Sequence, residues 1–166
     1  GSNAASAIAA VEAFAGGKQV DDEIIRAGLA QVDSPGRCEV LHRNPTVIID
    51  AAHNPHGIAA LVRTIKDEFD FSSLITVVAP MGDKDVRGIF EGLADIADRV
   101  VVSANSSSRS AAINDAEAIA HSIYGPDRTT VIPHLSDAIV KAIEQAKLDN
   151  DINDENCAVI ITGSVV

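Results

Sequence analysis

The stretch IIDAAHNPHG, residues Ile48–Gly57, joins the end of an apolar strand to the start of a helix. Aliphatic residues run up to Asp50, and a short polar loop then leads to Pro55, which presets φ for the first turn of a helix. A strand that is followed by a loop and a helix is the first half of a βαβ unit. We therefore predict a strand at Thr46–Ile49 and a helix at Gly57–Glu68.

The same alternation recurs along the rest of the chain, with about 25 to 30 residues in each unit, as expected for βαβ crossovers. Further apolar runs predict strands at Leu74–Ala79, Arg99–Val102, Thr129–Ile132 and Ala158–Ile161. Helical spacing predicts helices at Val86–Ile96, Asp115–Ile123 and Ser136–Leu148. The pattern favours an α/β fold with a doubly wound, mostly parallel, Rossmann-like sheet of five or six strands flanked by helices.

The two ends of the chain are less regular. We predict helices at Ala5–Phe14 and from Asp22 to about Ala30, a short strand at Cys38–His42, and a polar, acidic loop at Leu148–Asn156. The leading GSNA resembles the remnant of an expression tag, which is left out of fold reasoning. The chain stops soon after its last predicted strand, so we expect a piece that is truncated at the C-terminus.

Composition excludes several classes of protein. The 166 residues are 46% hydrophobic but only 3% aromatic, which indicates one aliphatic core. A formal net charge of −11 disfavours a general nucleic-acid or acidic-membrane surface. No apolar run approaches the roughly 20 residues of a membrane span, and no signal peptide opens the chain. Cys38 and Cys157 have no metal-site spacing, so we expect free thiols in a cytoplasmic protein.

Ligands of such sheets bind outside the carboxyl ends of the strands, so the polar residues there are candidates. Asp50 is one, although a helix cap or a turn would also use an Asp. Arg37 follows a tight turn and could reach a phosphate. Lys84 could meet an anion and Arg109 a carboxylate, although a solvated surface position is the more common role for each.

Other kinds of site find less support in the sequence. His53 and His56 have no third ligand nearby, so no metal site is predicted; His53 could instead orient a ligand by hydrogen bonding. The chain has no GxxxxGK[ST], no GxGxxG and no GxSxG motif. It therefore has neither a P-loop of its own nor a dinucleotide fingerprint.

Four motifs taken together resemble one family. SPGRCEVL, DAAHNPHG, MGDKD and ITGSVV occur in the order seen in the C-terminal portion of folylpolyglutamate synthase / dihydrofolate synthase, within the Mur-ligase superfamily. The sequence departs from that pattern at Ala51, where Gly is usual. The resemblance implies that residues 33–166 are a C-terminal glutamate-ligase domain, and that residues 1–32 hold the tag remnant and the helical tail of a preceding central domain.

The resemblance also implies an activity. The family uses ATP and Mg²⁺ to join the carboxylate of a folate or dihydropteroate to the amine of L-glutamate through an acyl phosphate. The P-loop, the metal ligands and most of the pterin site belong to the preceding domains, so this piece alone should be inactive. The parent enzyme is expected to be a cytoplasmic monomer.

The same resemblance assigns roles to individual residues. Arg37 and Asp50 match ATP-binding positions, and His53 matches a residue that positions groups at the reacting centre, which we take as catalytic. Arg109 lies in a loop that resembles the one recognising the amino-acid carboxylate, and the Lys84 and Asp85 motif is grouped with this glutamate site. Two alternatives stay open: a Mur-type cell-wall ligase domain and a non-catalytic α/β binding module.

Overall fold

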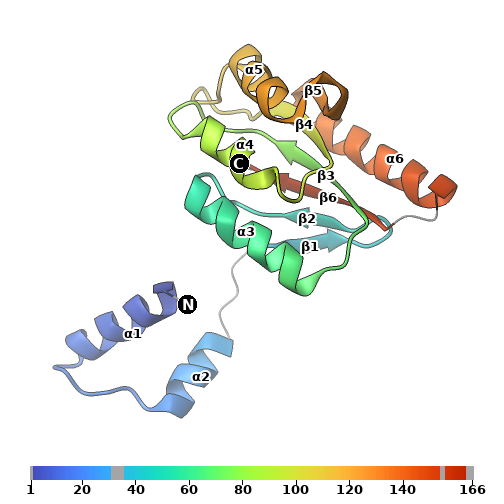
Figure 1. The fold of residues 1–166 in the computed structure, drawn as a ribbon. Coiled ribbons are helices and arrows are strands. Elements are labelled where there is room, and N and C mark those ends of the chain that lie inside the picture. The colour runs from blue at the N-terminus through green and yellow to red at the C-terminus, as the bar shows by residue number, and fades with distance from the viewer. Residues whose placement is uncertain (1, 31–35, 154–155, 164–166) are drawn as a thin grey trace. The chain divides into compact units, whose positions relative to one another are not determined.

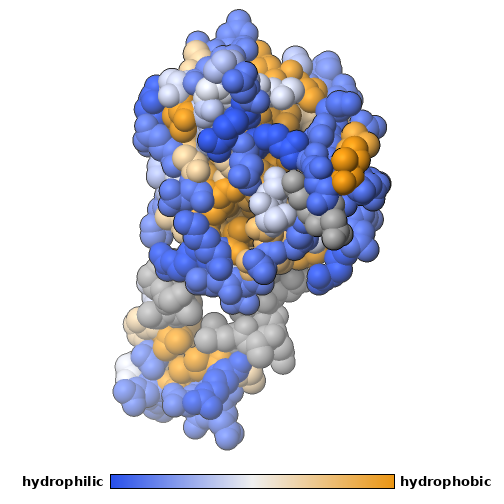
Figure 2. All heavy atoms as spheres, turned by 45° about the vertical axis from the view of Figure 1, so that its right-hand side comes forward, coloured by the Kyte–Doolittle hydropathy of each residue, from blue (hydrophilic) through white to orange (hydrophobic). Residues whose placement is uncertain are grey.

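The computed structural model describes residues 2–30, 36–153 and 156–163. The chain divides into two compact units, Gly1–Pro35 and Gly36–Val166. The first unit holds two helices, α1 (Ser2–Phe14) and α2 (Asp22–Ala30). Both helices expose large apolar side chains, and Figure 2 shows hydrophobic surface on this unit. The assignment of this unit to the tail of a central domain stays a prediction.

The second unit is built on one six-stranded sheet with the order β1-β2-β6-β3-β4-β5 (Figure 1). The strands are β1 (Glu39–His42), β2 (Val47–Ile49), β3 (Ser73–Val78), β4 (Arg99–Ala104), β5 (Thr129–His134) and β6 (Cys157–Thr162). Among the described strands of the sheet, only the pairing of β1 with β2 is antiparallel, and the other pairs are parallel. The predicted mostly parallel sheet of five or six strands is confirmed.

Helices cover both faces of the sheet (Figure 1). The helices of this unit are α3 (Pro55–Glu68), α4 (Val86–Leu93), α5 (Ile113–Tyr124) and α6 (Leu135–Asn153), with a 3-10 turn at Pro126–Arg128. On one face α3, α4 and α5 pack through buried residues such as Ile58, Phe90 and Ala120. On the other face α6 packs through Ala138, Ala142 and Ala146, whose spacing of four puts small side chains on one side of the helix.

The sequence of strand β6 is apolar from Cys157 to Ile161, and the position of the strand in the sheet explains this pattern. All six of its residues are buried. Ala158 and Ile160 point into the core under α3, α4 and α5, and Val159 and Ile161 point into the core under α6. Because a parallel strand in the middle of the sheet has no solvent side, both of its faces must be apolar.

The structure corrects several predicted boundaries, and the C-terminal ends of two helices differ by three residues or more. Helix α4 ends at Leu93, short of the predicted Ile96. Helix α6 continues to Asn153, through most of the segment Leu148–Asn156 that was predicted as a loop. That loop prediction was wrong.

The polar residues of this last part of α6 have partners in the neighbouring strands. Asp149 forms an ion pair with Arg99 at the start of β4. Asn150 brackets the start of β6: its side-chain oxygen accepts from the Cys157 amide at 2.6 Å, and its side-chain nitrogen donates to the Cys157 carbonyl at 3.2 Å. Composition alone favoured a solvated loop, but these tertiary contacts favour a continued helix. None of the described helices is long and apolar enough to cross a membrane.

The ion pair of Asp149 makes stability depend on pH. Burial raises the pKa of the Asp149 carboxyl, but the hydrogen bonds from Arg99 and Gln145 outweigh burial, so the pKa lies below its usual value. The charged form is therefore favoured by folding, and its contribution is complete above the ordinary carboxyl pKa of about 3.9. It is lost as the pH falls through the lowered pKa of the folded state.

We expect Asp149→Asn to lower the urea midpoint near neutral pH and to flatten its fall in acid. The reason is that the variant has no carboxylate to protonate at this position. Asp151→Asn, an exposed neighbour in the same helix, is the control and should follow the parent profile. Identical acid profiles for the parent and Asp149→Asn would contradict this account.

Candidate functional site

The loops that carry the predicted site residues all leave the carboxyl edge of the sheet. Asp50 follows β2, the segment Pro80–Asp85 follows β3, and Asn105–Ser110 follows β4. These strands run parallel to one another with β6 between β2 and β3, so their carboxyl ends share one edge. This is the edge at which open α/β sheets bind ligands.

Asp50 connects the end of β2 to the turn that precedes β1. Its side chain is only 6% exposed. One carboxylate oxygen accepts the Cys38 amide at 2.8 Å, and the other accepts the Ala52 amide at 2.8 Å. The neighbouring Ala51 amide donates to the Gly36 carbonyl at 2.6 Å. The turn and the strand end therefore form one hydrogen-bonded assembly.

Arg37 stands at the exposed centre of that turn, between two residues with left-handed backbone: φ is 69° at Gly36 and 49° at Cys38. Within residues 2–30, 36–153 and 156–163, the Arg37 guanidinium has no hydrogen-bond or ion-pair partner. Its five N–H donors are thus available to an anion such as a phosphate.

His53 lies exposed in the loop after β2, with its Nδ1 2.9 Å from the Ala51 carbonyl oxygen. A carbonyl oxygen can only accept, so Nδ1 carries the proton and the Nε2 of the neutral ring has a free lone pair. Asn54 caps α3 by accepting the Gly57 amide at 2.8 Å, and Pro55 occupies the first turn. The predicted place of Pro55 in the first turn of the helix is confirmed.

The loops after β3 and β4 are tied together. The Gly82 amide donates to the Arg109 carbonyl at 2.8 Å. Asp83 lies 3.5 Å from the Lys84 ammonium and 3.7 Å from the Arg109 guanidinium. The structure therefore brings the two predicted glutamate-binding cations to one carboxylate. Asp85 caps α4 by accepting the Gly88 amide, and its assignment to the glutamate site stays a prediction.

Three residues of this edge escaped the sequence analysis. Asp83 lies between the two cations, and its place beside Lys84 in MGDKD was the only available signal. The buried Asn105 donates to the Ala79 carbonyl at 3.3 Å and accepts from Ser107. Thr162 donates its hydroxyl to the Ala52 carbonyl at 3.1 Å. The contacts of Asn105 with Ala79 and of Thr162 with Ala52 join separate strand ends, so no local pattern could reveal them.

No described group of three or more His, Cys, Asp and Glu residues could hold a metal ion. The expectation that the Mg²⁺ ligands belong to preceding domains stays a prediction.

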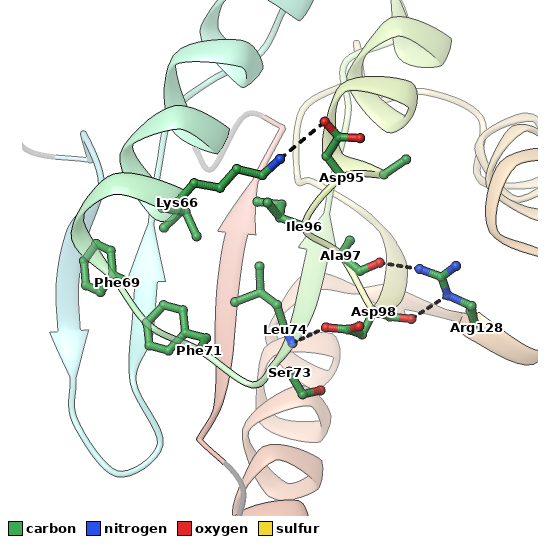
Figure 3. Close-up of a pocket in the computed structure, with 12 residues that line it drawn as sticks. Lys66, Phe69, Phe71, Ser73, Leu74, Asp95, Ile96, Ala97, Asp98 and Arg128 are labelled. Carbon is green, nitrogen blue, oxygen red and sulfur yellow. Dashed lines mark hydrogen bonds and ion pairs between the residues drawn. The ribbon is translucent and has the colours of Figure 1, made fainter.

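A pocket of about 300 Å³ opens at the other edge of the sheet, near the start of β3 and β4 (Figure 3). Its charged groups already have partners. Lys66 lies 3.4 Å from Asp95, and Arg128 donates to the carbonyls of Ala97 and Asp98. Arg37, which has no partner among the described residues, and the Nε2 of His53 lie instead at the carboxyl edge, which we therefore take as the candidate site.

Comparison with known proteins identifies the family to which this chain belongs. A family model described as "Mur ligase, glutamate ligase domain" matches residues 36–165. The chain belongs to this Mur ligase family. The match begins at Gly36, where the second compact unit also begins.

Similar members of the Mur ligase family are folate enzymes. Dihydrofolate synthase/folylpolyglutamate synthase of Mycobacterium tuberculosis is 43% identical over 99% of this chain and 36% of its own length. The solved structure of M. tuberculosis folylpolyglutamate synthase with ADP and AMPPCP has a TM-score of 0.88 and 44% identity, over 95% of this chain and 36% of that chain.

A bifunctional folylpolyglutamate synthase/dihydrofolate synthase solved with Mn, AMPPNP and L-glutamate has a TM-score of 0.72 and 26% identity, over 89% of this chain and 33% of that chain. This chain thus spans about a third of the length of these relatives. The resemblance seen in the sequence motifs is confirmed.

Gly163 allows the end of β6 to approach the end of β3. Its φ is +99°, and an added Cβ would lie 3.1 Å from the Ala79 nitrogen. Gly163→Ala should therefore lower the free energy of unfolding by about 2 kcal/mol, combining backbone strain with a clash.

Gly125→Ala is the matched control, because φ is +82° there but nothing lies within 4 Å of the added Cβ. It should cost only the strain, about 1 kcal/mol. Urea unfolding of both variants measures the difference, and equal losses would mean that the close approach at Gly163 does not matter.

Proposed function

We propose that this chain is the C-terminal domain of an ATP-dependent ligase that adds L-glutamate to the carboxylate of a folate or dihydropteroate. One observation carries the proposal: an Arg37 without a partner in the described part of the chain, a His53 with a free Nε2, and the Lys84 and Arg109 cations all stand on loops at one edge of the sheet. The folate-ligase relatives supply the substrate class.

The proposed reaction has two steps. The substrate carboxylate first attacks the γ-phosphorus of ATP, which gives an acyl phosphate and releases ADP. The amine of glutamate then attacks the acyl carbon, the C–O bond to phosphate breaks, and an amide and inorganic phosphate result. Such chemistry depends on positioning and on balancing charge more than on a nucleophilic side chain. It also needs water to be kept from the acyl phosphate, which closure of this domain over the rest of the enzyme would provide.

Arg37 is proposed to bind the phosphates of ATP. A guanidinium with free donors suits phosphate oxygens, and the hydrogen bonds on both sides of Arg37 hold its backbone in place. Relatives solved with ADP, AMPPCP or AMPPNP support a nucleotide as the ligand. Mg²⁺ would offset the negative charge of the phosphates when bound, and we assign its ligands to the parts of the enzyme outside this chain.

His53 and the loops after β3 and β4, whose two cations meet at Asp83, are proposed to bind glutamate and assist its reaction. With Nδ1 donating to the Ala51 carbonyl, Nε2 of His53 can accept a proton from the attacking amine. Arg109 and Lys84 would bind the glutamate carboxylates in place of Asp83, with Asp85 holding the helix beside them. Since we assign the P-loop, the metal ligands and most of the pterin site to parts of the enzyme outside this chain, the isolated chain is expected to be inactive.

The first experiment tests the substrate class with the full reading frame that encodes this chain. ADP release that depends on glutamate is followed with dihydropteroate, with tetrahydrofolate and with a UDP-linked muropeptide. We expect release with one or both pterins. ADP release with the muropeptide alone would instead identify the enzyme as a cell-wall ligase. No ADP release with any of the three substrates would refute a ligase of either kind.

Substitutions in the same full-length protein test the residue roles. Arg37→Ala should raise KM for ATP by roughly tenfold to a hundredfold, because a charge-assisted hydrogen bond is lost. His53→Ala should lower kcat by about a hundredfold with little change in KM for ATP. The controls are the exposed Arg63→Ala and His56→Ala on α3. The roles are refuted if Arg37→Ala and His53→Ala behave like their controls in steady-state assays.

A further inference from the structure

Asn105 is the first residue after β4, and it is buried although its side chain is polar. The residue is 8% exposed. Its Nδ2 donates to the Ala79 carbonyl at 3.3 Å and lies 3.2 Å from the Sδ of Met81, so it faces the loop that follows β3. Its Oδ1 accepts the Ser107 amide at 3.0 Å, within its own loop. The side chain therefore connects the two loops that carry the predicted glutamate-binding cations.

The hydrogen bond to Ser107 leads on to Arg109. The Ser107 hydroxyl accepts the Arg109 amide at 3.2 Å, and the Arg109 carbonyl accepts the Gly82 amide at 2.8 Å. Both polar groups of the Arg109 backbone are thus held, one by the loop after β4 and the other by the loop after β3. The exposed Arg109 side chain starts from this fixed backbone and reaches within 3.7 Å of Asp83, the carboxylate that also meets Lys84.

The two directions of hydrogen bonding explain why the residue is an asparagine. A turn that accepts an amide two residues ahead can be made by Asp as well as by Asn. Donation to the Ala79 carbonyl requires an N–H group, which a carboxylate lacks. Because a buried polar group without a partner costs free energy, an amide that donates to one loop and accepts from the other favours one arrangement of both loops.

We propose that Asn105 is a positioning residue of the glutamate site, which sets where Arg109 stands relative to Lys84 and acts on the substrate through Arg109. This rests on the proposed binding of glutamate by these two cations. Two cations bind the carboxylates of one small substrate together only at a suitable separation. Each cation stands on a separate loop, so contacts between the loops must set that separation.

Amide hydrogen exchange tests the structural half of the proposal on this chain. The Gly82 amide donates to the Arg109 carbonyl, and the Ala111 amide donates to the Pro80 carbonyl at 3.0 Å, so both amides report on the contact between the two loops. Asn105→Ala should raise the exchange rates of these two amides on the order of tenfold, because the loops lose the buried connection.

The Ala51 amide is the internal reference, because it donates to the Gly36 carbonyl between two other loops. Its exchange rate should be unaffected by Asn105→Ala. A rise at Ala51 as large as the rise at Gly82 would indicate general destabilisation and would overturn the proposal. An unchanged rate at Gly82 would overturn it as well.

The matched control variant is Asn150→Ala. It loses hydrogen bonds of the same kind, from the side chain to the amide and the carbonyl of Cys157, at the amino edge of the sheet. Exchange at Gly82 relative to Ala51 should be unchanged in this variant. An effect as large as that of Asn105→Ala would mean that the contact between the loops does not depend on Asn105 in particular, which contradicts the proposal.

Steady-state kinetics of the full-length protein test the functional half. Asn105→Ala should raise KM for glutamate about tenfold and leave KM for ATP unchanged, because Arg37 stands on a different loop. In an Arg109→Ala background, the same substitution should have no further effect on KM for glutamate. General destabilisation would not produce this pattern, and an equal rise of KM for glutamate in both backgrounds would overturn the proposal.

The kinetic outcomes also separate this proposal from the proposed function. If Arg109→Ala alone left KM for glutamate unchanged, the proposed glutamate contact would fail, and the positioning role with it. If Arg109→Ala raised KM for glutamate but Asn105→Ala did not, only the positioning role would be overturned.

A second variant covers the case in which Asn105→Ala does not fold. Ser107→Ala, at a half-buried position, removes the hydroxyl that accepts the Arg109 amide. It should raise KM for glutamate severalfold, and only when Arg109 is present. A Ser107→Ala enzyme with unchanged KM for glutamate would show that fixing the Arg109 backbone does not matter for the substrate.

Discussion

The second unit depends on the insertion of β6 between β2 and β3. These two strands do not pair with each other; each pairs in parallel with β6 over matched registers, from Val47 with Val159 on one side to Val78 with Thr162 on the other. The strand that comes last in the chain thus completes the middle of the sheet. Both apolar cores also run through it, because alternate residues of β6 point to opposite faces.

The same strand organises the candidate site. Its end carries the Thr162 hydroxyl and the Gly163 amide, and both donate to the Ala52 carbonyl. The Thr162 carbonyl accepts the Ala79 amide at 3.1 Å. The loop with His53 and the loop with Lys84 are therefore held in register by the strand between them. A change at the end of β6 should alter both loops, although β6 supplies none of the proposed binding side chains.

Much of this architecture could be predicted from local patterns. The apolar runs and the helical spacing located the five parallel strands and the four α-helices described in the sheet unit, since burial on both faces leaves a clear signal in sequence. The order of the strands could not be predicted in this way, because pairing of β6 with β2 and β3 is a contact between distant parts of the chain. The end of α6 was misread for the same reason: Asp149 and Asn150 look like loop residues until Arg99 and Cys157 are brought beside them.

Sequence motifs were even less informative about the roles of the residues in the candidate site. A motif can mark Arg37, Asp50 and His53 as important, but it cannot separate a residue that touches a ligand from one that holds another residue in place. That distinction depends on where the hydrogen bonds go. The Asp50 carboxylate is used by two backbone amides, the Arg37 guanidinium has no described partner, and the His53 ring is oriented through Nδ1 with Nε2 left over. Three polar residues within one motif set thus have three different hydrogen-bonding arrangements, which the motif alone does not distinguish.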